Sequence, residues 1–155
     1  MSLSEKYQEY KQRKEARDFF NKNNDEKVDY KDYLMTFFIG LLVSIGLGFV
    51  MQWIIYITHI NFAYFSILIG VLEAQAVKKV LHKSGNNLAV ISVITYVIGV
   101  VVAQTIYTMV IMSSFSLGLF VNMMFVYFRN ILVGDFFSTI ILLFGAIAAY
   151  MSLKD

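Results

Sequence analysis

The stretch "LMTFFIGLLVSIGLGFVMQWIIYI", residues 34–57, decides the fold class, because its 24 residues include no Asp, Glu, Lys or Arg. Crossing the ~30 Å hydrocarbon core of a bilayer takes about 20 helical residues. A helix is the element that satisfies all of its backbone hydrogen bonds within one segment, as lipid requires. Residues 34–57 are therefore predicted to form a transmembrane helix.

Three further apolar runs follow, at residues 61–77, 88–112 and 136–153. Each is close to the length of a membrane-spanning helix. Between the second and third runs, Gly85 could end one helix and Asn87 could cap the next. The pattern predicts an all-α, polytopic transmembrane four-helix bundle over residues 33–155.

The composition agrees with this prediction, since 58% of the residues are hydrophobic and 15% are charged. Residues 1–32 hold eight basic and eight acidic side chains, which indicates a solvated cytoplasmic tail. Glu9 and Arg13 have the four-residue spacing that supports a helix there. Because the tail is charge-balanced, nucleic acid is not an expected partner.

The basic residues predict the orientation of the four spans. If both termini are cytoplasmic, 12 of the 13 Lys and Arg residues lie inside and Arg129 alone lies outside. An excess of Lys and Arg in the cytoplasmic segments is the usual determinant of topology. We therefore expect a multi-pass protein of the cell (plasma) membrane with both termini cytoplasmic.

Residues 113–135, "SSFSLGLFVNMMFVYFRNILVGD", are apolar but interrupted by polar side chains. A helix over residues 115–128 would be only ~21 Å long, too short to cross. We expect an extracytoplasmic interfacial helix between the third and fourth spans. A shallow re-entrant helix and a fifth span remain alternatives, because the charge count is the same for each.

Small residues recur at four-residue spacing in every predicted span. Helices in lipid associate through close packing at such positions, so each of these stripes predicts a helix–helix contact face. The stripes are Gly40, Ser44 and Gly48; Ser66, Gly70 and Ala74; Thr95, Gly99 and Ala103; and Gly145 with Ala149.

Glu73 is the one charged residue inside the predicted second span, and it shares the helix face of Ser66 and Gly70. It lies about 7 Å along the axis from Lys78, which predicts a position near the inner interface. There the carboxylate could be hydrated, paired with a lysine or hydrogen-bonded to a neighbouring helix. An ion or proton role is the functional alternative, because intramembrane acids are commonly functional.

Two other polar features are candidates for function. Gln104 lies near the middle of the third span, where an interhelical hydrogen bond is the ordinary role of an amide. Lys78, Lys79 and Lys83 form a basic cluster, the candidate patch for anionic lipids of the cytoplasmic leaflet or for an acidic partner.

No chemistry of an enzyme is evident in the sequence. Cysteine is absent, and the two histidines, His59 and His82, fall on opposite sides of the predicted bilayer. No catalytic triad, zinc-helix motif or nucleotide fingerprint occurs. We therefore expect no catalytic residues, no cofactor-binding residues and no metal site.

Two segments carry a resemblance, "YFSILIGVLEAQAVKK" at residues 64–79 and "LLFGAIAAYMSLK" at residues 142–154. Both are similar to parts of small uncharacterised bacterial membrane proteins with four predicted spans, and the resemblance covers about 120 residues. It implies a helix that ends in a basic turn and a short last span that returns to the cytoplasm. Those proteins usually have an apolar residue where Glu73 stands, and the resemblance implies no catalytic residues.

Taken together, the residues favour an integral membrane protein that acts as a non-enzymatic accessory or interaction subunit. Its expected partner is another copy of the chain, in a homo-oligomer, or a different protein. The alternative is a small oligomeric ion or solute channel or transporter, with Glu73 and Gln104 as its polar lining.

Overall fold

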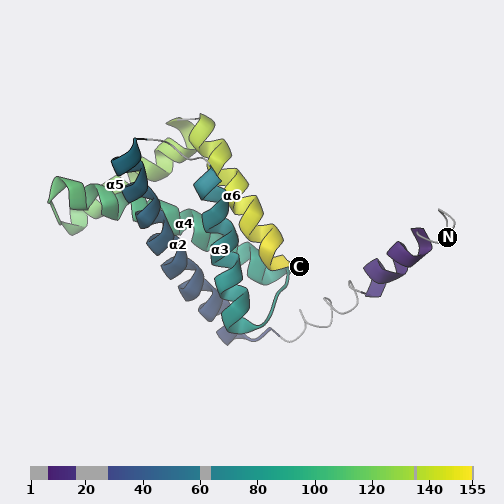
Figure 1. Ribbon diagram of the computed structural model, residues 1–155. Helices are drawn as coiled ribbons and strands as arrows, with labels where there is room; N and C mark the ends of the chain where they lie inside the picture. The colour runs from purple at the N-terminus through teal and green to yellow at the C-terminus, as the bar shows by residue number, and fades with distance from the viewer. Residues whose placement is uncertain (1–6, 17–27, 60–63, 135, 155) are drawn as a thin grey trace.

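The computed structural model describes residues 7–16, 28–59, 64–134 and 136–154, and every regular element within them is helical (Figure 1). This confirms the predicted all-α class. Four long helices account for most of the chain, and a shorter helix with a π-helical segment lies between the last two. In chain order the elements are α2 (Tyr30–Thr58), α3 (Tyr64–Leu81), α4 (Asn86–Met112), α5 (Leu117–Arg129), η1 (Asn130–Gly134) and α6 (Phe136–Lys154).

The predicted tail is described in part. Residues 7–16 are helical, and Arg13 donates to the Glu9 carboxylate at 2.6 Å, which confirms the pairing expected from their spacing. Residues 1–6 and 17–27 of the predicted tail lie outside the described residues.

The turn between α3 and α4 differs from the prediction. His82, not Gly85, ends α3: it has a left-handed φ of 54°, and its N–H donates to the Lys78 carbonyl at 2.9 Å. Gly85, with a φ of 155°, instead precedes α4 as its N-cap residue, while Asn87 lies inside the first turn. Helix α3 therefore continues through Lys78 and Lys79, which the sequence had suggested lay beyond the span.

The start of α2, the α3–α4 turn and the end of α6 lie together at one end of the bundle. Lys83 in the turn forms an ion pair with Asp32 of α2 at 2.5 Å. The Gly85 N–H donates to the Leu153 carbonyl of α6 at 3.1 Å. The four long helices thus alternate in direction, with the first residue of α2 and the last residues of α6 at the same end, here called the charged end (Figure 1).

Helices α2 and α4 run parallel, and their small residues touch at three successive levels. A Cβ added to Gly40 would lie 2.5 Å from Thr95 Oγ1, and one added to Gly48 would lie 2.8 Å from Ala103 Cβ. Between these levels, Gly99 lies against the Ser44 side chain and the α2 backbone. The predicted contact faces of both helices are therefore confirmed, and the missing side chains are what allow the backbones to approach.

Helices α3 and α6 form the second close pair. A Cβ on Gly70 would collide with the carbonyl of Gly145 and would lie 3.3 Å from the Ala149 nitrogen. A Cβ on Gly145 would in turn meet the Ser66 carbonyl oxygen at 2.7 Å. The packing faces predicted for these two helices are also confirmed.

The interior of the bundle combines apolar side chains such as Leu88 and Leu153 with many small and polar ones, while large apolar side chains cover the outside. The buried residues of α2 are Thr36, Gly40, Ser44 and Gly48. On the outside, Phe38 and Leu42 of the same helix are 61% and 68% exposed. A helix on the surface of a water-soluble protein has the opposite arrangement to α2, with its large apolar side chains turned toward the core.

Helix α5 and η1 lie at the end of the bundle opposite the charged end (Figure 1). The Ser116 side chain caps α5 by accepting from the Leu119 N–H at 3.1 Å, and none of the α5 residues is buried. The hydroxyls of Thr108 and Tyr127, 2.6 Å apart, hold α5 against α4. A helix separate from the long ones therefore exists within 113–135, as predicted.

By length and composition, α2 and α4 are long and apolar enough to cross a membrane. Helix α3 has 18 residues, but Glu73, Lys78 and Lys79 lie within it. Helix α6 has 19 residues. The two candidate spans support a membrane protein, and the assignment of α3 and α6 as further spans is taken up below as a proposal.

Candidate functional site

Glu73 is completely buried at the middle of α3, where that helix meets α2 and α4. Its Oε2 atom lies 2.5 Å from the Ser44 hydroxyl of α2. Its Oε1 atom lies 2.5 Å from the Thr95 hydroxyl and 3.3 Å from the Ser92 hydroxyl, both of α4. The carboxyl group thus connects three helices, and we call these four residues the Glu73 cluster.

The cluster depends on Gly40. A Cβ at this position would lie 2.6 Å from Glu73 Oε1 and 2.5 Å from Thr95 Oγ1, so any side chain would displace the carboxyl group. The four-residue spacing of Gly40 and Ser44 puts both on the α2 face that meets α4. The absent side chain thus leaves the space that the carboxyl group fills, and the serine supplies a hydrogen-bond partner.

The contact with Ser44 gives the position of Glu73 along α2. Its partner Ser44 is 12 residues beyond Asp32, which is ~18 Å along the helix from the charged end. Ser44 is also close to the middle of the uncharged run 34–57. Of the possibilities left open by the sequence, the structure shows hydrogen bonds to neighbouring helices.

A second buried polar contact lies next to the Glu73 cluster. Tyr96, the residue after Thr95, is completely buried, and its hydroxyl forms a hydrogen bond with the Ser66 hydroxyl of α3. The same tyrosine hydroxyl packs against Gly145 of α6, where a Cβ would collide with it. Helix α6 is thereby tied to the polar interior through α4 and α3.

Gln104 is not part of the Glu73 cluster. It is nine residues beyond Thr95 on α4, which places it ~14 Å further along the helix and on the opposite face. Its side chain is partly exposed, and its carbonyl accepts from the Thr108 hydroxyl at 3.0 Å. The two candidate polar residues therefore do not line a common path within one chain.

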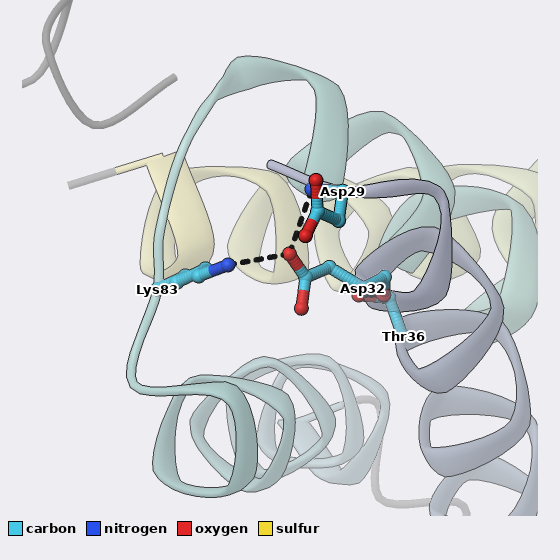
Figure 2. Close-up of polar contacts among 4 residues, drawn as sticks. All are labelled: Asp29, Asp32, Thr36 and Lys83. Carbon is cyan, nitrogen blue, oxygen red and sulfur yellow. Dashed lines mark hydrogen bonds and ion pairs between the residues drawn. The ribbon is translucent and has the colours of Figure 1, made fainter. Parts of the chain in front are cut away.

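The three candidate lysines of the basic patch have different surroundings in the structure. Lys78 and Lys79 are exposed in the last turn of α3, whereas Lys83 is paired with Asp32. Figure 2 shows the Asp32 carboxylate between the Lys83 ammonium and the Asp29 N–H, which donates to it at 2.9 Å. The hydrogen bond from Lys83, followed by that from Asp29, lowers the pKa of Asp32 below its ordinary value of 3.8.

Sequence reasoning found Glu73, Ser44 and Thr95 but not their association, and it missed Ser92 and Tyr96. The signal for those two was present, because residues 92, 95, 96 and 99 follow the i, i+3, i+4, i+7 pattern of one helix face. All four are buried. A polar residue on a face already marked by small residues was thus an indication of a buried hydrogen bond.

The chemistry available to the cluster is that of one carboxyl group and three hydroxyl groups. Among the described residues, no three His, Cys, Asp or Glu side chains come together as a metal site. Hydroxyl groups and a carboxyl group can share protons or provide hard oxygen ligands. Comparisons of the chain with protein-family models, with curated proteins and with solved structures each gave no match.

Proposed function

We propose that this chain is a multi-pass integral membrane protein in which α2, α3, α4 and α6 each cross the bilayer. The observation that carries the proposal is the outer surface of large apolar side chains on the long helices, together with α2, which buries only small and polar residues. Such a surface is stable in lipid, whereas water would leave it exposed at a large cost in free energy.

The helix lengths support four spans. Helices α3 and α6, with 18 and 19 residues, reach ~27 and ~28 Å, which is close to the hydrocarbon thickness. Helices α2 and α4 are longer and would cross with tilt or extend beyond the hydrocarbon. The start of α2 and the end of α6 both lie at the charged end, so the two termini would be on the same side of the membrane. The positive-inside pattern indicates that this side is the cytoplasm.

Within the membrane, the proposed role is that of a non-enzymatic accessory or interaction subunit. At the glycines, the backbones of α2 and α4 and those of α3 and α6 are in close contact. Such tightly packed helices are suited to a scaffold. Lys78 and Lys79, exposed at the end of α3, would attract anionic lipids of the cytoplasmic leaflet. The suspected relation to small bacterial four-span membrane proteins belongs to the same proposal.

Proteoliposomes containing the purified full-length chain test this role. A scaffold adds no proton, sodium or potassium flux to that of protein-free vesicles, and gentle detergent extraction from native membranes retains its partner in fixed stoichiometry. Flux that rises in proportion to the amount of protein would contradict the accessory role.

A small ion or solute transporter is the second candidate, favoured by the buried carboxyl group of Glu73 at the centre of three helices. If flux is found, Glu73→Gln should abolish it. Gln104→Ala is the matched control, because Gln104 lies on the opposite face of α4. Equal loss of flux in both variants would show that the Glu73 cluster is not the transport site.

A further inference from the structure

We propose that the Glu73 cluster is a proton-binding site, in which Glu73 holds one exchangeable proton at neutral pH and clamps α2, α3 and α4 together as the neutral acid. The inference requires only that these helices pack as described. It does not depend on whether the bundle serves as an accessory subunit or as a transporter.

The complete burial of Glu73 without a described counter-charge carries the inference, and the hydrogen bonds around Thr95 are compatible with it. The Thr95 hydroxyl has one hydrogen but three acceptors within reach: Glu73 Oε1 at 2.5 Å, the Ser92 carbonyl at 2.9 Å and the Ile91 carbonyl at 3.1 Å. A helical threonine ordinarily donates to a carbonyl three or four residues earlier. The Thr95 hydroxyl can therefore donate to an ionised Oε1, or it can donate to a backbone carbonyl while a protonated Glu73 donates to Thr95.

The neutral acid then satisfies every strong contact in the cluster. A protonated Glu73 would donate from Oε1 to the Thr95 hydroxyl, 2.5 Å away, while the Ser44 hydroxyl donates to Oε2 at 2.5 Å. Ser92, at 3.3 Å, makes only a weak contact with the same carboxyl group. An ionised Glu73 would instead accept from both Ser44 and Thr95, and Thr95 would then not donate to the carbonyls of its own helix.

Burial supports the same state. Glu73 is completely buried, and an ionised carboxylate without a counter-charge is among the most costly groups to bury. The closest described ion pair, Asp32–Lys83, lies ~18 Å away along α2. Loss of the proton would leave a charge that three hydroxyl dipoles alone must solvate, so we expect it to loosen the contact of α3 with α2 and α4.

The spacing of the oxygens favours a proton over a metal cation. A cation such as Ca²⁺ sits about 2.3–2.6 Å from each oxygen that binds it, and oxygens that share one cation are therefore held well apart. The two shortest contacts here join oxygens at 2.5 Å, the length of a hydrogen bond.

Few other titratable groups could mimic the titration of Glu73. From α4, the titratable neighbour of Glu73 is Tyr96. The described residues of α2 that contact Glu73 are Ser44 and Gly40, and neither is titratable. From α6, the described titratable groups are Tyr150 and Lys154, both toward the charged end. None of these is a carboxyl group, and Glu73 is the one buried carboxyl group among the residues that the structure describes.

Infrared spectroscopy of the full-length protein in lipid nanodiscs tests the proposal. At pH about 7, where ordinary carboxyl groups are ionised, the wild-type protein should show the C=O stretch of a protonated carboxylic acid. That band should be absent from Glu73→Gln and should decline at higher pH. Ser44→Ala and Thr95→Val should each shift it to higher frequency, because a hydrogen bond to the acid is lost.

Thr105→Val is the matched control, since Thr105 is also buried on α4 but its hydroxyl donates to the Val101 carbonyl at 2.9 Å. This variant should leave the band in place. A carboxylate band in the wild-type minus Glu73→Gln spectrum at neutral pH would overturn the proposal, as would removal of the acid band by sodium at constant pH. If Glu73→Gln does not fold, the presence or absence of the acid band in the wild-type protein decides the question.

Discussion

The contact between Gly70 and Gly145 gives the sharpest test of the helix packing. Replacing Gly70 with Ala adds a single methyl group that would collide with the Gly145 carbonyl and approach the Ala149 nitrogen to 3.3 Å. Both are backbone groups of α6, so no side-chain rotation relieves the contact. Helices α3 and α6 must move apart.

The matched control is Gly46→Ala on α2, where an added Cβ has nothing within 4 Å. Replacing Gly with Ala inside a helix stabilises it by about 0.5–1 kcal/mol, and this gain applies to both variants. Overpacking of a tight interior typically costs about 1–3 kcal/mol, and the upper part of that range applies where backbone is the obstacle. We therefore expect the Gly70→Ala protein to be less stable than the Gly46→Ala protein by about 2–3 kcal/mol.

Reversible unfolding in mixed micelles, followed by circular dichroism as the fraction of denaturing detergent rises, measures this difference. A gap of about 2 kcal/mol corresponds to a change of roughly 30-fold in the unfolding equilibrium constant, which such titrations resolve. Equal stability of the two variants would refute the close approach of α3 and α6.

Three other results are expected. Tyr96→Phe removes the hydroxyl that bonds to Ser66, and the bundle should lose about 0.5–1.5 kcal/mol in the same unfolding titration; no loss would mean that this hydrogen bond adds nothing to stability. The pKa of Asp32 is lower in the folded chain than its ordinary value of 3.8, so its ion pair with Lys83 stabilises the fold above that pH. The melting temperature should therefore fall as the pH drops from about 5 to about 3, and it should fall less steeply in Asp32→Asn. Identical pH profiles of the two proteins would contradict this role. Replacing Lys78 and Lys79 with Gln should weaken the selectivity of the reconstituted protein for anionic over zwitterionic lipid, and unchanged selectivity would exclude them as the lipid patch.

The sequence was sufficient to predict the four long helices and their contact faces. Charge-free runs of helical length and small residues at four-residue spacing are local signals, and the burial of Gly40, Ser44 and Gly48 follows from them directly. The pairing of these faces was not predictable, because periodicity identifies a face but not the helix that it meets.

The Glu73 cluster illustrates that limit. Its parts lie 29 residues apart between α2 and α3, and 22 residues apart between α3 and α4, and only the register of the packed helices brings Ser44 and Thr95 to the carboxyl group. The residue that ends α3 was missed because His82 adopts a left-handed conformation more typical of glycine or asparagine.

The central claim, an even number of crossings with both termini cytoplasmic, is tested most directly by cysteine labelling in intact cells. The chain has no cysteine, so Asp155→Cys and Ser114→Cys are single-cysteine proteins without further changes. A membrane-impermeant maleimide should label residue 114, in the turn between α4 and α5, from outside, and should label residue 155 only after the membrane is permeabilised. Labelling of residue 155 in intact cells would contradict the four-span account.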